Sequence, residues 1–87
     1  MKTNSQLHTN LQGIVSFNIR MHMAARKLNQ QQIADALGIS RPAVSQKLSG
    51  KHVWTLDDIE KVSDFLHVKP ETLLVAGHGF EPWTSGL

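Results

Sequence analysis

The chain has 87 residues, of which 40% are hydrophobic, and it carries a formal net charge of +2. This length predicts one small domain with a compact core built mostly from local contacts. The sequence contains no cysteine, which excludes a disulfide framework and a thiolate metal site. It also contains no apolar run of transmembrane length and no signal-peptide core. We therefore expect a cytoplasmic protein with no membrane partner.

The charge is unevenly distributed along the chain. Residues 20–51 contain six basic residues and one acid, which gives this segment a charge of +5. Residues 52–74 contain two basic residues and five acids, which gives −3. The first segment suits a polyanionic partner, and the second does not.

The N-terminal third of the chain predicts an arm followed by a helix. Residues 1–9 are polar and aperiodic, so we expect a disordered arm there. Residues 10–27 carry apolar side chains at i, i+3 and i+4 spacings, including Leu11, Val15, Ile19 and Met23, which is typical of one helix face.

A second helix is predicted between Asn29 and Gly38. Asn29 is a candidate N-cap, because its side chain can accept hydrogen bonds from the unpaired amides of the first turn. Ile33, Ala34 and Leu37 form the apolar face. Gly38 ends the helix, because glycine adopts the left-handed conformation without steric cost.

A third helix is predicted over residues 41–49. Ser40 is its candidate N-cap, and Pro42 falls in the first turn, where the missing amide proton costs nothing. Val44 and Leu48 give it an apolar i, i+4 stripe. Two short helices joined by a tight turn containing glycine make a helix-turn-helix.

The remaining sequence predicts two more helices and a tail. Thr55 is the candidate N-cap of a fourth helix that extends to Leu66, and Trp54 before it is expected to pack between helices three and four. Pro70 opens a short fifth helix that is expected to fray, because the preceding Lys69 cannot cap it. Residues 76–87 are expected to be a flexible tail, serving as a linker or as a packing segment through Phe80 and Trp83.

Residues 29–51 resemble the helix-turn-helix of the lambda-repressor-like family of phage repressors and Cro proteins, the Cro/C1-type domain. The matching positions are Gln30, Ala34, Gly38, Ile39 and Val44. The resemblance covers roughly residues 11–75 and implies an all-α fold of five helices, in which helices two and three form the helix-turn-helix. It defines a DNA-binding domain over residues 10–75.

The resemblance also implies which side chains contact DNA, since the third helix would enter the major groove. The residues that face away from Val44 and Leu48 are the candidates for base readout: Arg41, Pro42, Ser45 and Gln46. Candidates for phosphate contacts lie at the start of helix two and around the end of helix three: Asn29, Gln30, Lys47, Lys51 and His52. Arg41 can pair with guanine and Gln46 with adenine, whereas a phosphate contact is the alternative for Arg41.

We interpret the chain as a sequence-specific, non-enzymatic transcriptional repressor of the phage Cro or immunity-repressor type, which binds a double-stranded DNA operator. It would act as a homodimer on palindromic sites or as a monomer. The alternatives are an antitoxin or restriction-controller regulator of the same fold, and a protein-interaction module that binds no DNA. No pair of histidines at i, i+4 spacing and no phosphate-binding glycine loop is present, so we expect no catalytic residue, no metal and no cofactor.

Overall fold

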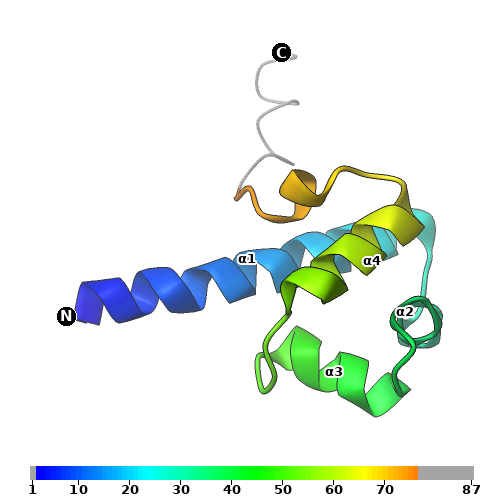
Figure 1. Ribbon diagram of the computed structural model, residues 1–87, viewed down its shortest axis with the longest axis horizontal. Helices are drawn as coiled ribbons and strands as arrows, with labels where there is room; N and C mark the ends of the chain where they lie inside the picture. The colour runs from blue at the N-terminus through cyan, green and yellow to red at the C-terminus, as the bar shows by residue number, and fades with distance from the viewer. Residues whose placement is uncertain (1, 77–87) are drawn as a thin grey trace.

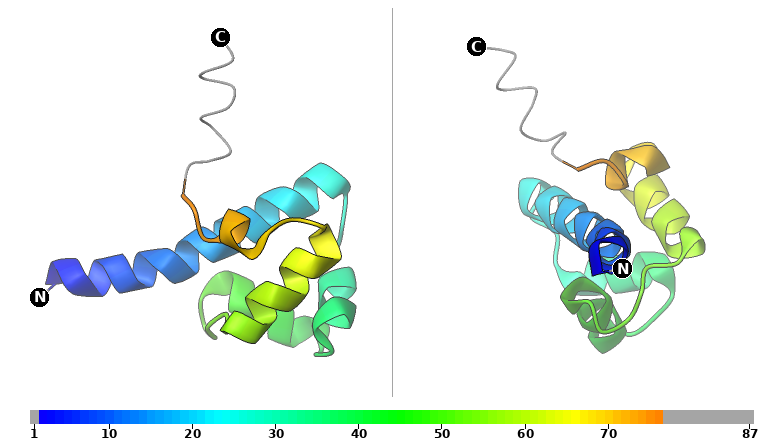
Figure 2. Two further views of the ribbon diagram at one scale, coloured as in Figure 1. Left: turned by 45° about the horizontal axis from the view of Figure 1, so that its top comes forward. Right: turned by 90° about the vertical axis from the view of Figure 1, so that its left-hand side faces the viewer.

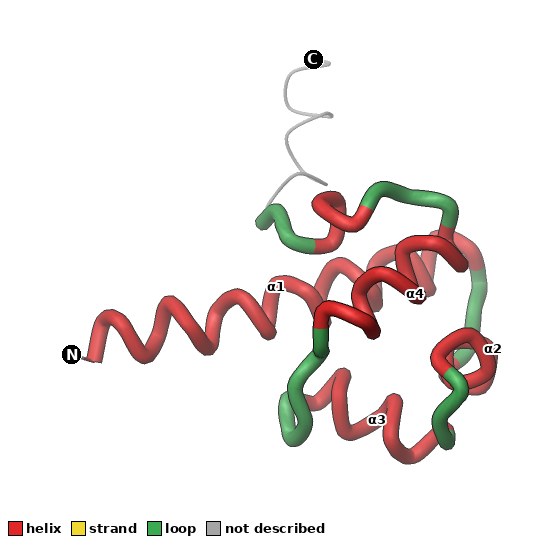
Figure 3. Tube along the Cα trace, in the orientation of Figure 1, coloured by secondary structure: helices red, strands yellow, loops and turns green. Residues whose placement is uncertain are grey.

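The computed structural model describes the backbone of residues 2–76 and the side chains of residues 11–76. Its elements, in chain order, are the α-helices α1 (Lys2–Arg26), α2 (Gln30–Leu37), α3 (Arg41–Ser49) and α4 (Leu56–Leu66) and the 3-10 helix η1 (Pro70–Leu73). Figures 1 and 3 show these helices, and residues 2–76 contain no strand. The predicted all-α fold is confirmed, but the fifth helix is a single 3-10 turn.

Helix α1 begins at Lys2, so the prediction of a disordered arm is wrong for residues 2–9. These residues include no glycine or proline, and nothing in the segment forces the helix to start later. Figures 1 and 2 show that the N-terminal part of α1 lies apart from the other helices. The C-terminal part of α1 passes behind α4 in Figure 1, and a short loop leads from its end to α2.

The turn between α2 and α3 has the predicted caps. Asn29 forms a capping box with Gln32, in which each side chain accepts a hydrogen bond from the other residue's amide at 2.9 Å. Gly38 adopts the left-handed conformation with φ 72°, and its amide donates to the carbonyls of Ala34 and Asp35. Ser40 accepts from the Ala43 amide at 3.3 Å and opens α3. Because the end of α2 and the start of α3 are both capped, the orientation of α2 relative to α3 is fixed.

The core lies between α1, α2, α3 and α4. Thirteen buried apolar side chains form one cluster: Val15, Ile19, Met23, Ile33, Ala34, Leu37, Val44, Leu48, Trp54, Ile59, Val62, Leu66 and Leu73. All three predicted apolar positions of α2 and both of α3 belong to it. Burial of these faces leaves the opposite face of α3 exposed to solvent.

Asn18 of α1 holds η1 in place. Its side chain is 2% exposed, and its Nδ2 donates to the carbonyl oxygens of Leu73, Val75 and Thr72 at 2.8, 3.2 and 3.4 Å. Lys69 precedes η1 and provides no side-chain cap, as predicted. The fifth helix is short because no side chain caps its start and because Asn18 of α1 binds its carbonyl groups. The tail predicted over residues 76–87, with Phe80 and Trp83, lies outside the described residues except for Ala76.

Replacing Gly13 with alanine is expected to raise the free energy of unfolding by about 0.5–1 kcal/mol, since glycine in a helix interior is less favourable than alanine. Gly13 lies within α1, and a methyl group there would meet no atom within 4 Å. The matched control is Gly38→Ala, where the added methyl also meets nothing but φ is 72°. Chemical denaturation should show stabilisation for the first variant and destabilisation for the second. Destabilisation by Gly13→Ala would contradict this account of α1.

Candidate nucleic-acid interface

The exposed face of α3 carries the four residues predicted to read bases. Arg41, Pro42, Ser45 and Gln46 are all exposed. Val44 and Leu48, on the opposite face, are 0% and 5% exposed. The short helix therefore presents a polar, hydrogen-bonding surface to solvent, and its opposite face packs into the core.

Arg41 and Ser45 share a surface hollow with the start of α2. The hollow has a volume of about 560 Å³ and is lined by Met23, Asn29, Gln30, Gln31, Arg41 and Ser45. The structure thus brings together two predicted base-reading residues and two predicted phosphate-contacting residues. Pro42 and Gln46 lie on the same helix face but do not line the hollow.

The N-terminus of α2 is equipped to bind an anion. The Asn29 side-chain oxygen accepts from the Gln32 amide, and within the described residues its Nδ2 has no hydrogen-bond partner. The amides at the start of a helix lack partners within the helix, and the helix dipole places partial positive charge there. Asn29 is exposed, whereas Gln30 is half-buried. Both lie at the N-terminus of α2.

The loop after α3 presents Lys51 and His52. Their backbone amides donate to the carbonyl of Gln46 at 2.9 and 3.2 Å, which folds the loop back over the end of α3. Both side chains are exposed and have no ion-pair or hydrogen-bond partner among the described side chains, those of residues 11–76. They are thus available to an external anion.

Gln12 and Ser16 of α1 hold this loop through Trp54. Gln12 Oε1 accepts from the Trp54 amide at 2.6 Å, and Gln12 Nε2 donates to the Trp54 carbonyl at 3.1 Å. Ser16 Oγ accepts from Trp54 Nε1 at 2.8 Å and donates to the Lys47 carbonyl at 3.2 Å. The sequence analysis missed this arrangement. Its signal was a pair of polar residues, Gln12 and Ser16, that lie one turn apart beside the apolar face of the helix.

Lys47, which was predicted to contact a phosphate, has its ammonium group bound within the protein. Its Nζ lies 2.7 Å from Asp58 Oδ2, donates to the Val53 carbonyl at 3.0 Å and lies 5.9 Å from the Trp54 ring centroid. The Lys47 and Asp58 side chains are 15% and 13% exposed. Lys47 lies on the half-buried side of α3, so its role is to join α3 to α4.

The Lys47 contact changes the ionisation of Asp58. Partial burial by itself raises the pKa of Asp58, but hydrogen bonds from Lys47 and the Thr55 amide and the charge of Lys47 outweigh it. The pKa of Asp58 therefore lies below its ordinary value of 3.8. A carboxyl group with a lowered pKa in the folded state stabilises the protein above its unfolded pKa, and this stabilisation is lost as the pH falls through the folded pKa.

We expect Lys47→Met to lower the free energy of unfolding by about 1–2 kcal/mol at neutral pH, because it leaves a mostly buried carboxylate without its cation. The difference from the wild type should disappear at pH values below the pKa of Asp58. The matched control is Lys61→Met, since Lys61 forms an exposed i, i+4 pair with Asp57 at 3.1 Å. That change should cost less than about 0.5 kcal/mol. Denaturation as a function of pH measures both, and an equal loss in the two variants would contradict the structural role of Lys47.

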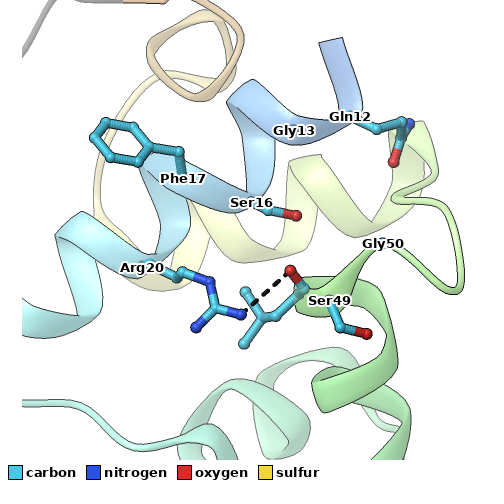
Figure 4. A pocket seen from close by; sticks show the side chains of 8 residues that line it. Gln12, Gly13, Ser16, Phe17, Arg20, Ser49 and Gly50 are labelled. Atoms are coloured by element: carbon cyan, nitrogen blue, oxygen red, sulfur yellow. Dashed lines mark hydrogen bonds between the residues drawn. The ribbon is translucent and has the colours of Figure 1, made fainter. Parts of the chain in front are cut away.

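Two further basic residues of segment 20–51 are also bound within the protein. Arg20 Nη2 donates to the Leu48 carbonyl near the end of α3 at 3.3 Å, as Figure 4 shows. Arg26 Nη2 donates to the Leu66 carbonyl near the end of α4 at 3.3 Å. Cations are favourable at helix C-termini, where carbonyl groups lack partners. The +5 charge of this segment thus overstates the charge available to DNA.

The described part of the chain shows no arrangement for metal binding and no membrane span. No three histidine or acidic side chains in this part of the chain are grouped to hold an ion. No helix within the same range is both long and apolar enough to cross a bilayer.

The chain matches one domain-family model and is similar in fold to one solved structure. A family model described as a Cro/C1-type HTH DNA-binding domain matches residues 18–76. The structure is similar to the crystal structure of a hypothetical transcription factor, NHTF, from Neisseria, with a TM-score of 0.74 and 23% sequence identity over 84% of each chain. At this identity the likeness shows the fold alone. No curated protein matches the chain.

Proposed function

Since the chain belongs to the Cro/C1-type helix-turn-helix DNA-binding domain family, we propose that it is a sequence-specific transcriptional repressor of the phage Cro or immunity-repressor type. It binds a double-stranded DNA operator in the cytoplasm and blocks access of RNA polymerase to a promoter. It needs no cofactor and catalyses no reaction.

The observation that carries this proposal is the placement of the exposed α3 face beside the N-terminus of α2. Arg41 and Ser45 on α3 line one hollow with Asn29 and Gln30. The major groove of B-DNA admits an α-helix, and residues near the N-terminus of that helix reach base edges. A protein surface that combines these donors with a helix N-terminus can bind bases and an adjacent phosphate together.

In this arrangement Arg41 donates two hydrogen bonds to guanine O6 and N7, and Gln46 pairs with adenine N6 and N7. Ser45 adds a hydrogen bond to a base edge, and Pro42 contacts a thymine methyl group. These four residues supply sequence discrimination.

The phosphate contacts position the protein on the duplex. Asn29 and Gln30 donate to one phosphate from the start of α2, and Lys51 and His52 contact another from the loop after α3. Lys47 is not part of this set, because it is paired with Asp58. The protein acts as a homodimer on a palindromic operator or as a monomer on a single half-site.

Selection of bound fragments from random genomic DNA tests the proposal. We expect recovery of a short shared motif. Binding to that motif should weaken as the salt concentration rises, because binding of the protein releases cations from the DNA phosphates and this release is less favourable at high salt. A protein-interaction module would retain no DNA, or would retain fragments without a shared motif. Either of those results would reject the repressor function.

A further inference from the structure

A surface hollow lies between α1 and the C-terminal end of α3, and we call it the α1–α3 hollow (Figure 4). It has a volume of about 580 Å³. Its α1 wall runs from Gln12 to Arg20, and its other wall consists of Leu48 and residues 49–50. Gly13 and Gly50 contribute only backbone to these walls, and a methyl group added at either position would meet no atom within 4 Å. The hollow is therefore open to a group from outside the protein.

The α1–α3 hollow carries a positive charge that no acid balances. Among the described residues that line it, Arg20 is the only charged one. Arg20 is exposed and forms no ion pair with any of the side chains of residues 11–76. A hollow lined by charge of one sign raises the local concentration of ligands of the opposite sign. The ligand that suits this hollow is therefore an anion.

The guanidinium group of Arg20 keeps most of its hydrogen-bond donors. Its Nη2 donates to the Leu48 carbonyl at 3.3 Å, whereas within the described residues its Nη1 and Nε have no hydrogen-bond partner. Arg26 differs, because its Nη1 lies 2.7 Å from His22 Nδ1 and its Nη2 donates to the Leu66 carbonyl. The bond to Leu48 holds the Arg20 guanidinium at the hollow. The planar set of remaining donors suits the oxygens of a phosphate group.

The α1–α3 hollow continues the candidate nucleic-acid interface along α3. Arg41, Ser45 and Ser49 follow one another at steps of four residues, so they lie on one side of α3. Arg41 and Ser45 line the hollow at the start of α3, together with Met23 of α1. Ser49 lines the hollow at the end of α3, together with Arg20, three residues before Met23 on α1. The two hollows thus follow each other along the contact of α1 with α3, and a DNA strand that runs beside α3 would meet Arg20.

We propose that Arg20 binds a phosphate of the operator DNA in the α1–α3 hollow, in addition to the phosphate contacts made from the start of α2 and the loop after α3. The inference rests on the proposed function and adds a contact from α1, which lies outside the helix-turn-helix. Phosphate contacts position a protein on the duplex and carry no sequence information directly. Arg20 therefore contributes affinity, and the residues of α3 contribute the base preference.

The salt dependence of binding by the full chain to its selected DNA motif tests this contact. Each neutralised phosphate contributes about −0.9 to the slope of log K against log salt concentration. Arg20→Met should therefore make the slope shallower by about one and lower the affinity roughly tenfold at about 0.1 M salt. Arg20→Lys should restore the slope, and fragment selection with either variant should recover the wild-type motif. The matched control is Lys61→Met, which removes one charge from the exposed surface of α4 and should leave the slope unchanged.

A second pair of variants leaves Arg20 and its bond to Leu48 intact. Gly13→Glu and Gly13→Gln add side chains of nearly the same shape at a position that has free space, and both residues favour a helix more than glycine does. Only Gly13→Glu places a carboxylate in the α1–α3 hollow. It should bind the motif severalfold more weakly than Gly13→Gln, because the carboxylate repels a phosphate. This pair decides the question if circular dichroism shows that Arg20→Met does not fold.

An unchanged salt slope in folded Arg20→Met would overturn the proposal, even if the affinity fell, because Arg20 would then only stabilise the end of α3. Equal affinities of Gly13→Glu and Gly13→Gln would also overturn it. In both cases the wild type still selects a motif, so the proposed function stands. If the wild type selects no motif, the proposed function fails, and the contact of Arg20 with operator DNA fails with it.

Discussion

Replacing Trp54 with alanine is expected to lower the free energy of unfolding by about 3–5 kcal/mol, the usual cost of truncating a buried aromatic side chain. Trp54 is 3% exposed, and its Nε1 donates to Ser16. The change removes the ring beneath Lys47 and leaves a cavity between α1 and the loop after α3. It should also weaken DNA binding, because this loop presents Lys51 and His52.

The matched control for Trp54→Ala is Val53→Ala. Val53 is adjacent in the chain and 61% exposed, so its truncation should change the free energy of unfolding by less than about 0.5 kcal/mol. Urea denaturation followed by circular dichroism measures both variants. A loss below about 1 kcal/mol for Trp54→Ala would show that the loop is not anchored through this ring.

Asn18→Ala is expected to lower the free energy of unfolding by about 3 kcal/mol, because it removes the donor that serves the carbonyls of Thr72, Leu73 and Val75. A buried acceptor without a partner costs roughly 1–3 kcal/mol. The amides of η1 should also exchange with solvent faster, because α1 no longer holds this segment. Hydrogen exchange and urea denaturation test the two effects.

The control for Asn18→Ala removes an amide group from the surface. Gln31 is exposed, and its Nε2 donates to Asp35 Oδ1 at 2.9 Å on the same helix. Gln31→Ala should cost less than about 0.5 kcal/mol. If the two variants lose equal stability, the buried hydrogen bonds of Asn18 do not hold η1.

The helix-turn-helix could be predicted from sequence because its boundaries depend on local chemistry. Asn29, Gly38 and Ser40 act through their own backbone conformations or through neighbouring amides, and these interactions need no knowledge of tertiary contacts. The exposed face of α3 followed from helical periodicity once Val44 and Leu48 were assigned to the core. Family resemblance added the DNA roles of the exposed residues.

The remaining features depend on contacts between residues far apart in the chain. Lys47 resembles an ordinary surface cation in sequence, and only the packing of α3 against α4 brings Asp58 to it. Arg20 likewise reaches the Leu48 carbonyl across the α1 and α3 contact. The early start of α1 was missed because polar composition indicates solvent exposure and does not exclude a helix.

The central claim is that α3 reads DNA bases, and it is tested most directly by repeating the fragment selection with Arg41→Ala and Gln46→Ala. We predict that each variant recovers the wild-type motif with relaxed preference at one position, corresponding to about 1–3 kcal/mol of lost discrimination. Lys61→Met, on the exposed surface of α4 and outside the hollow shared by α2 and α3, should recover the motif unchanged. A motif that neither Arg41→Ala nor Gln46→Ala alters would contradict base readout by α3.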